Sequence, residues 1–142
     1  MQFIPYLTFN GDCKDAMEFY ARTLRADIES MFTFAGTPAE AHVPAEARGQ
    51  IMHASLALKG QTILMASDSG GMPHEKAGGM SVSIVMDDTP EAERIFAALS
   101  EGGTVTMPID RTFWAERFGM CVDRYGTPWM INSGMPQEAP AS

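Results

Sequence analysis

The stretch RTFWAERFGMCVDRYGTPWMIN, residues 111–132, is predicted to form two β-strands closed by a turn at Tyr125-Gly126, with a bulky aromatic segment leading into the first strand. An earlier stretch, from His53 to Ser67, turns in the same way at Lys59-Gly60. Each hairpin is preceded by an apolar strand, an amphipathic helical segment and a further strand. The chain is therefore predicted to contain one supersecondary unit twice.

The helical segments give the sequence offset between the two copies. An offset of 76 residues maps the apolar helix positions Ala16, Phe19 and Tyr20 onto Ala92, Ile95 and Phe96. Asp12 and Thr89 are the expected helix N-caps. The predicted fold class is α+β, with two βαβββ modules that form a curved, mostly antiparallel mixed sheet around a cleft. Within this one domain, the expected segments are a first module at 1–67, a linker at 68–79, a second module at 80–133 and a disordered tail at 134–142.

The composition limits the kinds of partner. The chain has 142 residues and a net charge of −8, without a run of basic residues, which argues against nucleic acid and anionic membranes as partners. It shows neither an apolar run of transmembrane length nor a signal peptide. Cys13 and Cys121 have no metal-binding or redox spacing, so a reduced cytoplasmic protein is expected.

Strand alternation sorts the side chains onto two sheet faces. With a two-residue turn at Lys59-Gly60, Ser55 is predicted to oppose Leu64, and His53 to oppose Ala66. One face is bulky and apolar and is expected to pack under the helices. The other is small and partly polar, and it collects His53, Ser55, Asp68, Ser81, Ser83, Gly119, Cys121, Met130 and Asn132. Such a face is typical of a ligand cleft, and coverage by a dimer partner or by solvent is the alternative.

Few of these side chains suggest chemistry. His53 is a weak candidate for a catalytic acid or base, or a group that orients a ligand; a structural histidine is the alternative. Asp68 is either a solvated carboxylate at a strand end or the partner that orients His53. Phe113 and Trp114 either cover the cleft, pack across a dimer boundary or fill the core. Cys121 is interpreted as a buried, inert thiol.

Several segments resemble a known family: PYLTF (5–9), GDCKDAMEFY (11–20), IMHA (51–54), TFW (112–114), FG (118–119) and DRYGTPWMIN (123–132). They are similar to the PhnB-like branch of the vicinal-oxygen-chelate superfamily, which includes glyoxalase I, bleomycin-resistance proteins and extradiol dioxygenases. This branch is also described as 3-demethylubiquinone methyltransferase-like. The resemblance spans Phe3 to Asn132 and implies the paired-module fold, a homodimer and a cleft for a small molecule.

The same resemblance implies where a metal would bind. Glyoxalase-type members hold a divalent cation through His, Glu or Gln on the first and last strand of each module. The repeat places those positions at Pro5, Leu64, Ser81 and Met130, and none of these is a normal ligand for such a cation. The sequence therefore predicts no metal site and no cofactor, with a divalent metal recruited by His53 as the alternative.

The glycine pairs of the chain do not follow the Gly-rich strand-to-helix turn that a nucleotide-derived methyl donor usually needs, so methyl transfer is not expected. The leading hypothesis is a cytoplasmic homodimer that binds a small, partly apolar molecule. The rival is a lyase, isomerase or oxygenase of the same fold, and the third option is a structural protein with a vestigial cleft. The residues alone do not decide whether a reaction is catalysed.

Overall fold

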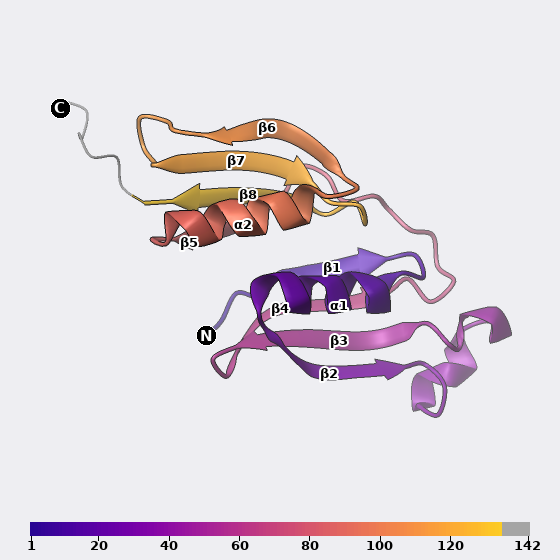
Figure 1. Cartoon of the computed structure of the whole chain (residues 1–142). Coiled ribbons are helices and arrows are strands. Elements are labelled where there is room, and N and C mark those ends of the chain that lie inside the picture. The colour runs from indigo at the N-terminus through magenta and orange to yellow at the C-terminus, as the bar shows by residue number, and fades with distance from the viewer. Residues whose placement is uncertain (135–142) are drawn as a thin grey trace. The chain divides into compact units, whose positions relative to one another are not determined.

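The two predicted copies fold as two compact units, unit 1 at residues 1–75 and unit 2 from residue 76 onward, in a computed structural model that describes residues 1–134. Each unit contains one α-helix and a four-stranded mixed sheet (Figure 1). This confirms the α+β class and the two βαβββ modules. Apart from Gly134, the predicted tail lies outside the described residues.

Unit 1 follows the order strand, helix and three strands. Its elements are β1 (Tyr6–Phe9), α1 (Cys13–Leu24), β2 (Asp27–Thr33), β3 (Ile51–Leu58) and β4 (Gln61–Asp68). The long loop before β3 contains two short 3-10 helices, η1 (Pro38–His42) and η2 (Ala45–Ala47). The sheet order is β1-β4-β3-β2, and β1 pairs with β4 in parallel while the other pairs are antiparallel.

Unit 2 repeats this arrangement. Its elements are β5 (Val82–Met86), α2 (Thr89–Ser100), β6 (Thr104–Asp110), β7 (Arg117–Val122) and β8 (Pro128–Ser133). The sheet order β5-β8-β7-β6 matches that of unit 1, with β5 and β8 in parallel. The helices start 76 residues apart, at Cys13 and Thr89, as the sequence predicts.

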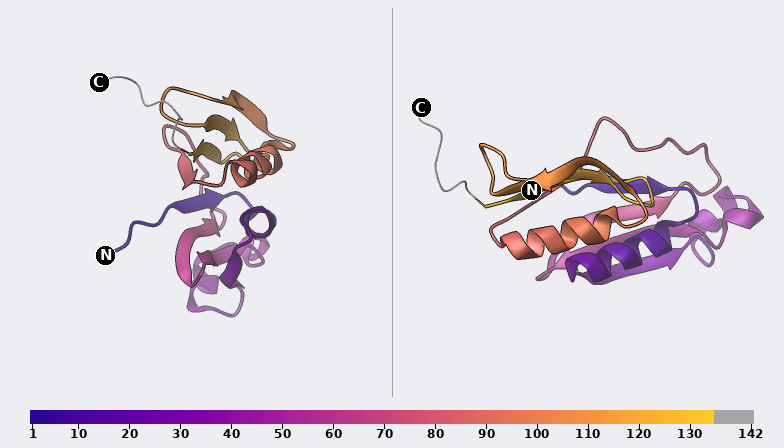
Figure 2. Two further views of the ribbon diagram at one scale, coloured as in Figure 1. Left: turned by 60° about the vertical axis from the view of Figure 1, so that its left-hand side comes forward. Right: turned by 45° about the horizontal axis from the view of Figure 1, so that its top comes forward.

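In each unit the helix covers one face of its own sheet, which Figure 2 shows for α1 seen end-on. The expected helix positions Ala16, Tyr20, Ala92 and Leu99 are fully buried. Helix α1 also buries Met17 and Thr23, which the apolar spacing did not predict. We call the opposite face of each sheet its helix-free face. Neither helix in the described part of the chain reaches the length and hydrophobicity needed to span a bilayer.

The two helices begin differently. Asp88, rather than Thr89, caps α2, and its carboxylate accepts a hydrogen bond from the Glu91 backbone N–H. Asp12 occupies the N-cap position of α1, but its side chain makes no capping hydrogen bond. The carboxylate of Asp68, from the end of β4, takes over this role by accepting from the Cys13 N–H.

The first hairpin corrects the predicted pairing of β3 and β4. The turn is as expected, with positive φ at both Lys59 and Gly60 and Leu58 opposite Gln61. Beyond it, however, Ile63 is an unpaired bulge residue between the pairs Ala57–Thr62 and Leu56–Leu64. One extra residue shifts the rest of β4 by one position and exchanges its faces. Ser55 therefore opposes Met65, and Ala54 opposes Ala66.

The second hairpin corrects a turn. Val122 pairs with Pro128, so the connection is a five-residue loop, Asp123–Thr127, and not a two-residue turn. Asp123 organises the loop by accepting from the backbone N–H groups of Tyr125 and Thr127, and from the Trp129 indole at 2.7 Å. The odd loop length places Gly119 opposite Ile131 and Cys121 opposite Trp129 on the helix side. Gly119 and Cys121 therefore do not share a face with Met130 and Asn132, contrary to the prediction.

Candidate functional site

His53 lies on the helix-free face of unit 1 between two aromatic rings. β3 presents it opposite Phe32 of β2, and the two ring centroids are 6.0 Å apart. On its other side lies Tyr6 of β1, at 5.9 Å between centroids. Tyr6 and Phe32 are 51% and 44% exposed, respectively. An imidazole and two accessible rings thus form a small aromatic surface.

The phenol of Tyr6 orients the imidazole. Its oxygen lies 3.3 Å from His53 Nδ1 and forms a hydrogen bond whose direction depends on the tautomer. Within residues 1–134, Nε2 of His53 has no hydrogen-bond partner. If the phenol donates to Nδ1, then Nε2 carries the proton and is a donor; in the other tautomer it is an acceptor and a base.

A polar cluster lies beside this aromatic surface. Glu29 Oε1 accepts from Ser55 Oγ at 3.1 Å and from Thr62 Oγ1 at 2.7 Å. Ser55 is 3% exposed, and its hydroxyl also lies 3.1 Å from that of Ser30. Glu29 joins the cluster through a bulge, because it is unpaired between Ile28 and Ser30. Thr62 shares the face of Ser55 because it pairs with Ala57 next to the turn.

Asp68 does not belong to this surface, and it is not a solvated carboxylate. It is 4% exposed and lies on the helix side of the sheet. Its Oδ1 accepts from the N–H groups of Gly11 and Cys13, and its Oδ2 from that of Ile51. The carboxylate thus ties the start of α1 to the start of β3, and the β4 bulge removes it from the face of His53.

Three of the four strand-borne candidates in unit 2 do lie on its helix-free face. Ser83 pairs with Met130, and Asn132 pairs with Val85 of β5. Ser81 precedes β5 and is exposed. The register also aligns the methionines at 107, 120 and 130 across β6, β7 and β8. This face therefore combines a row of flexible thioethers with the polar side chains of Ser83 and Asn132.

Phe113 and Trp114 lie in the loop between β6 and β7. Phe113 is 72% exposed and Trp114 42% exposed, so neither fills the core. Their rings meet edge to face at 4.7 Å, and Trp114 makes a second edge contact with Phe118 at 5.2 Å. Phe118 pairs with Asn132, so this aromatic chain ends on the helix-free face of unit 2.

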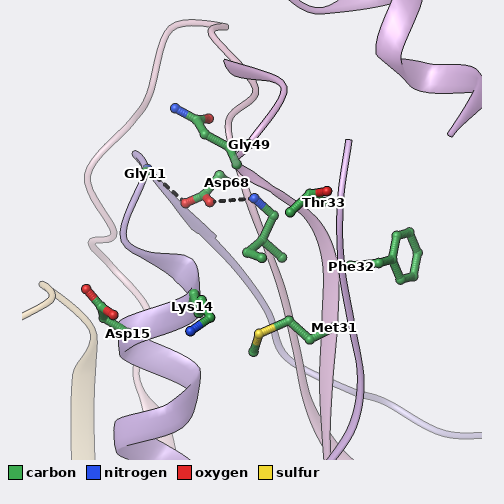
Figure 3. A pocket seen from close by; sticks show the side chains of 10 residues that line it. Gly11, Lys14, Asp15, Met31, Phe32, Thr33, Gly49 and Asp68 are labelled. Atoms are coloured by element: carbon green, nitrogen blue, oxygen red, sulfur yellow. Dashed lines mark hydrogen bonds between the residues drawn. The ribbon is translucent and has the colours of Figure 1, made fainter. Parts of the chain in front are cut away.

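A cavity of about 400 Å³ lies on the other side of the unit 1 sheet, between α1 and the edge strand β2 (Figure 3). Met31 and Thr33 point toward the helix, whereas the Phe32 ring points away from it. Asp68 lies at the cavity, but its oxygens are already used by backbone N–H groups. The cavity therefore does not include the imidazole of His53, and nothing in the sequence pattern predicted it.

The donor set does not suit a divalent metal. On the helix-free faces, β1 and β4 present the pair Tyr6–Met65, and β5 and β8 present Ser83–Met130. Phenol, hydroxyl and thioether groups are poor ligands for hard or borderline cations. Within residues 1–134, no group of three or more His, Cys, Asp or Glu side chains is arranged to hold a metal ion. The expectation about cofactors is thereby neither confirmed nor contradicted.

Both cysteines are free and buried. Burial, reinforced by the nearby carboxylates of Asp68 and Asp12, raises the pKa of the Cys13 thiol to about 12. Burial also raises the pKa of Cys121. A thiol with a raised pKa is a poor nucleophile at neutral pH, which agrees with the inert role predicted for Cys121.

Sequence reasoning missed the residues that complete the site in unit 1, namely Tyr6, Glu29, Phe32 and Thr62. Tyr6 and Phe32 were identifiable as alternating aromatic residues of two strands. Thr62 is already placed on this face by the predicted turn, because it opposes Ala57. Glu29 was not identifiable, because regular alternation places it on the other face of β2 and only the bulge beside Ser30 frees it.

The chain is similar to a known protein family, to a protein of Escherichia coli and to a protein of known crystal structure. The sequence profile of the family described as 3-demethylubiquinone-9 3-methyltransferase matches residues 1–132. The protein YjdN of Escherichia coli is 36% identical over 93% of this chain and 95% of its own length. The crystal structure of protein PA1353 from Pseudomonas aeruginosa is 43% identical with a TM-score of 0.86, over 96% of this chain and 99% of that one.

A more distant structure confirms the fold. The glyoxylase/bleomycin resistance protein/dioxygenase domain from Frankia sp. EAN1pec has a TM-score of 0.68 at 12% identity, over 97% of this chain and 94% of that chain. At this identity the likeness concerns the fold alone. The glyoxalase-like fold implied by the sequence resemblance is thereby confirmed.

Proposed function

Because the chain belongs to the 3-demethylubiquinone-9 3-methyltransferase family, whose PhnB-like members have a glyoxalase-like fold, we propose that it binds a small, partly apolar molecule on the helix-free face of unit 1. The observation that carries this proposal is the placement of His53 between Tyr6 and Phe32, with the phenol held on Nδ1. Accessible rings supply apolar contact, and Nε2 supplies a directional hydrogen bond.

The methyl-transfer activity in the family's description is not part of this proposal. The strand-to-helix connections are Asn10–Asp12 in unit 1 and Asp87-Asp88 in unit 2, and neither is a Gly-rich turn that brings backbone close to a nucleotide. Their carboxylates would also repel an anionic group at these helix starts.

Unit 2 is proposed to contribute a second surface. Ser83, Met130 and Asn132 lie on its helix-free face, with Ser81 at the margin. The exposed pair Phe113 and Trp114 adds aromatic area beside it. The substitution Trp114→Ala is expected to lower the affinity of the protein for any ligand that binds to this surface. If Trp114→Ala binds the ligand with unchanged affinity, the loop between β6 and β7 is not part of the binding surface.

A homodimer in the cytoplasm remains our proposal for the working form of the protein, and it rests on the family resemblance. The exposed side chains of Val85 and Met107, at 74% and 43%, provide apolar surface for such an association. Sedimentation equilibrium at micromolar concentration tests it, and a monomer mass throughout would refute it.

The binding proposal is tested by an NMR screen of small apolar and aromatic compounds against the isotope-labelled protein. Hits are expected to shift the resonances of Tyr6, Phe32 and His53. Affinity should fall about tenfold in His53→Ala through loss of a hydrogen bond and ring contact. The matched control is His42→Ala in η1, which should change nothing. Hits that shift only Gly11, Lys14 and Met31 would move the site to the cavity beside α1.

A lyase, isomerase or oxygenase is the second candidate, favoured by the unpartnered Nε2 of His53, which can move a proton. Metal content measured by mass spectrometry separates the two. About one divalent ion per chain, lost in His53→Ala, would favour the enzyme; a metal-free protein that binds ligand through the aromatic surface would favour the binding role.

A further inference from the structure

We propose that Glu29 sets the ligand class of the helix-free face of unit 1, and that this class is small aromatic molecules carrying a protonated amine. The inference rests on the proposed function, because it concerns the same face. It adds a specificity-determining residue on β2, a strand that carries none of the predicted site residues.

The first reason is that the carboxylate of Glu29 reaches the helix-free face through the bulge in β2. Regular alternation would place the side chains of Glu29 and Ser30 on opposite faces of β2. The bulge between Ile28 and Ser30 frees Glu29 from the ladder, and its carboxylate reaches Ser55 and Thr62 on the helix-free face. Thr62 lies on the same face because it pairs with Ala57 next to the turn. Bulges that re-aim side chains are common beside binding sites.

The second reason is that the carboxylate is fixed before any ligand arrives. Both hydroxyl groups donate to Oε1, and Ser55 is itself held by Ser30. Oε2 has no hydrogen-bond partner in the described part of the chain, and Glu29 is an exposed residue. A preorganised acceptor loses little entropy on binding, so its interaction contributes more to affinity.

The third reason is charge. Within residues 1–134, no lysine, arginine or histidine forms an ion pair with Glu29. An uncompensated carboxylate repels carboxylates and phosphonates and attracts a cation. The exposed rings of Tyr6 and Phe32 add a favourable surface for a cation and for an aromatic group.

The register sets the length of the ligand. Ser55, which holds the carboxylate, is two residues from His53 on one face of β3, a separation of about 7 Å along the strand. A ring seated against His53 and an ammonium on Glu29 are therefore joined by a short chain. Phenethylamine has this shape and serves as a probe.

The alternative is that Glu29 only satisfies the hydroxyls of Ser55 and Thr62. Glu29→Gln separates the two roles, because the amide oxygen still accepts both hydrogen bonds while the negative charge is lost. Ser55→Ala is the complementary variant, since it keeps the charge but removes one of the groups that hold it. Glu46→Gln, an exposed carboxylate of η2, is the charge-matched control.

The experiment is an NMR titration at pH 8 with phenethylamine, neutral 2-phenylethanol and anionic phenylacetate, following Tyr6, Phe32 and His53. Phenethylamine is expected to bind wild type about tenfold more tightly than the alcohol, and phenylacetate more weakly than either. Glu29→Gln should abolish the preference for the amine and leave the alcohol unchanged. Ser55→Ala should reduce the preference, and Glu46→Gln should retain it.

Other results are equally informative. If the alcohol shifts the His53 resonances as strongly as the amine, or if Glu29→Gln weakens all probes alike, the role of Glu29 is overturned while binding at this face stands. If phenylacetate binds more tightly than phenethylamine, the role of Glu29 is likewise overturned, and binding at this face stands. If no probe shifts these resonances, both this inference and the proposed function are overturned.

Discussion

The helix-free faces of the two units have the same strand order but different side chains. In unit 1 that face carries His53, Tyr6 and the hydroxyls around Glu29, whereas unit 2 presents aligned methionines and Phe118. The β3–β4 ladder contains a bulge, while the β7–β8 ladder is regular. A repeated topology thus fixes the scaffold, while the residues on the helix-free face differ between the copies, and unit 2 has its own irregularities between β6 and β7.

The largest expected difference between the units is in the loss of unfolding free energy when the last residue of β4 or of β8 is replaced. Asp68 and Ser133 occupy equivalent positions, opposite Phe9 and Met86. Asp68→Ala leaves three backbone N–H groups without their acceptor and is expected to cost about 3 kcal/mol or more of unfolding free energy. Ser133→Ala loses one hydroxyl contact, to Thr89, and should cost about 1 kcal/mol.

Urea unfolding followed by circular dichroism measures both variants. Equal losses for Asp68→Ala and Ser133→Ala would show that the tie between α1 and β3 is not specific to unit 1.

A smaller effect is expected where the sheets meet their helices. Gly119 of β7 and Ala54 of β3 are equivalent, opposite Ile131 and Ala66. A Cβ at Gly119 would lie 2.8 Å from the Phe96 ring and 3.0 Å from Ile109, so Gly119→Ala should cost about 1–3 kcal/mol through overpacking.

The reciprocal change Ala54→Gly should cost about 1 kcal/mol through backbone entropy. Thermal unfolding compares the two. A neutral Gly119→Ala would show that α2 is packed less tightly on its sheet than the structure indicates.

An effect that vanishes at neutral pH concerns the cysteines in alkaline solution. The Cys13 thiol ionises near its ordinary pKa of 9.0 in the unfolded chain, but only near about 12 in the folded one. Its contribution to stability is complete below pH 9 and is lost as pH rises toward 12, by up to about 1.4 kcal/mol per pH unit. Cys13→Ala should therefore flatten the alkaline limb of a stability–pH curve more than Cys121→Ala. An unchanged slope in Cys13→Ala would contradict this assignment.

The fold could be read from the sequence because the helix faces and hairpin glycines repeat, and those signals are local. The orientation of His53, Ser55, Ser83, Met130 and Asn132 was also predicted correctly. Asp68, Gly119 and Cys121 were assigned to the wrong face, because a bulge at Ile63 and a five-residue loop at Asp123–Thr127 each shift the register by one.

The polar cluster at Glu29 could not be predicted from the sequence, because it also depends on a bulge that shifts the register of a strand. No residue type announces a bulge, and its position depends on how the neighbouring strand pairs. The aromatic surface was closer to prediction, since Tyr6 and Phe32 alternate onto the face of His53.

The positions of the two tryptophans have an optical consequence. Both tryptophans of the chain, Trp114 and Trp129, belong to unit 2, one 42% exposed and the other 1% exposed. Excitation at the red edge of the indole band therefore reports on unit 2, with Trp129 as a blue-emitting core signal and Trp114 as a solvent-sensitive one. Unit 1 is silent in that emission and contributes to circular dichroism. If the two signals change at different urea concentrations, the repeated units lose their structure one after the other.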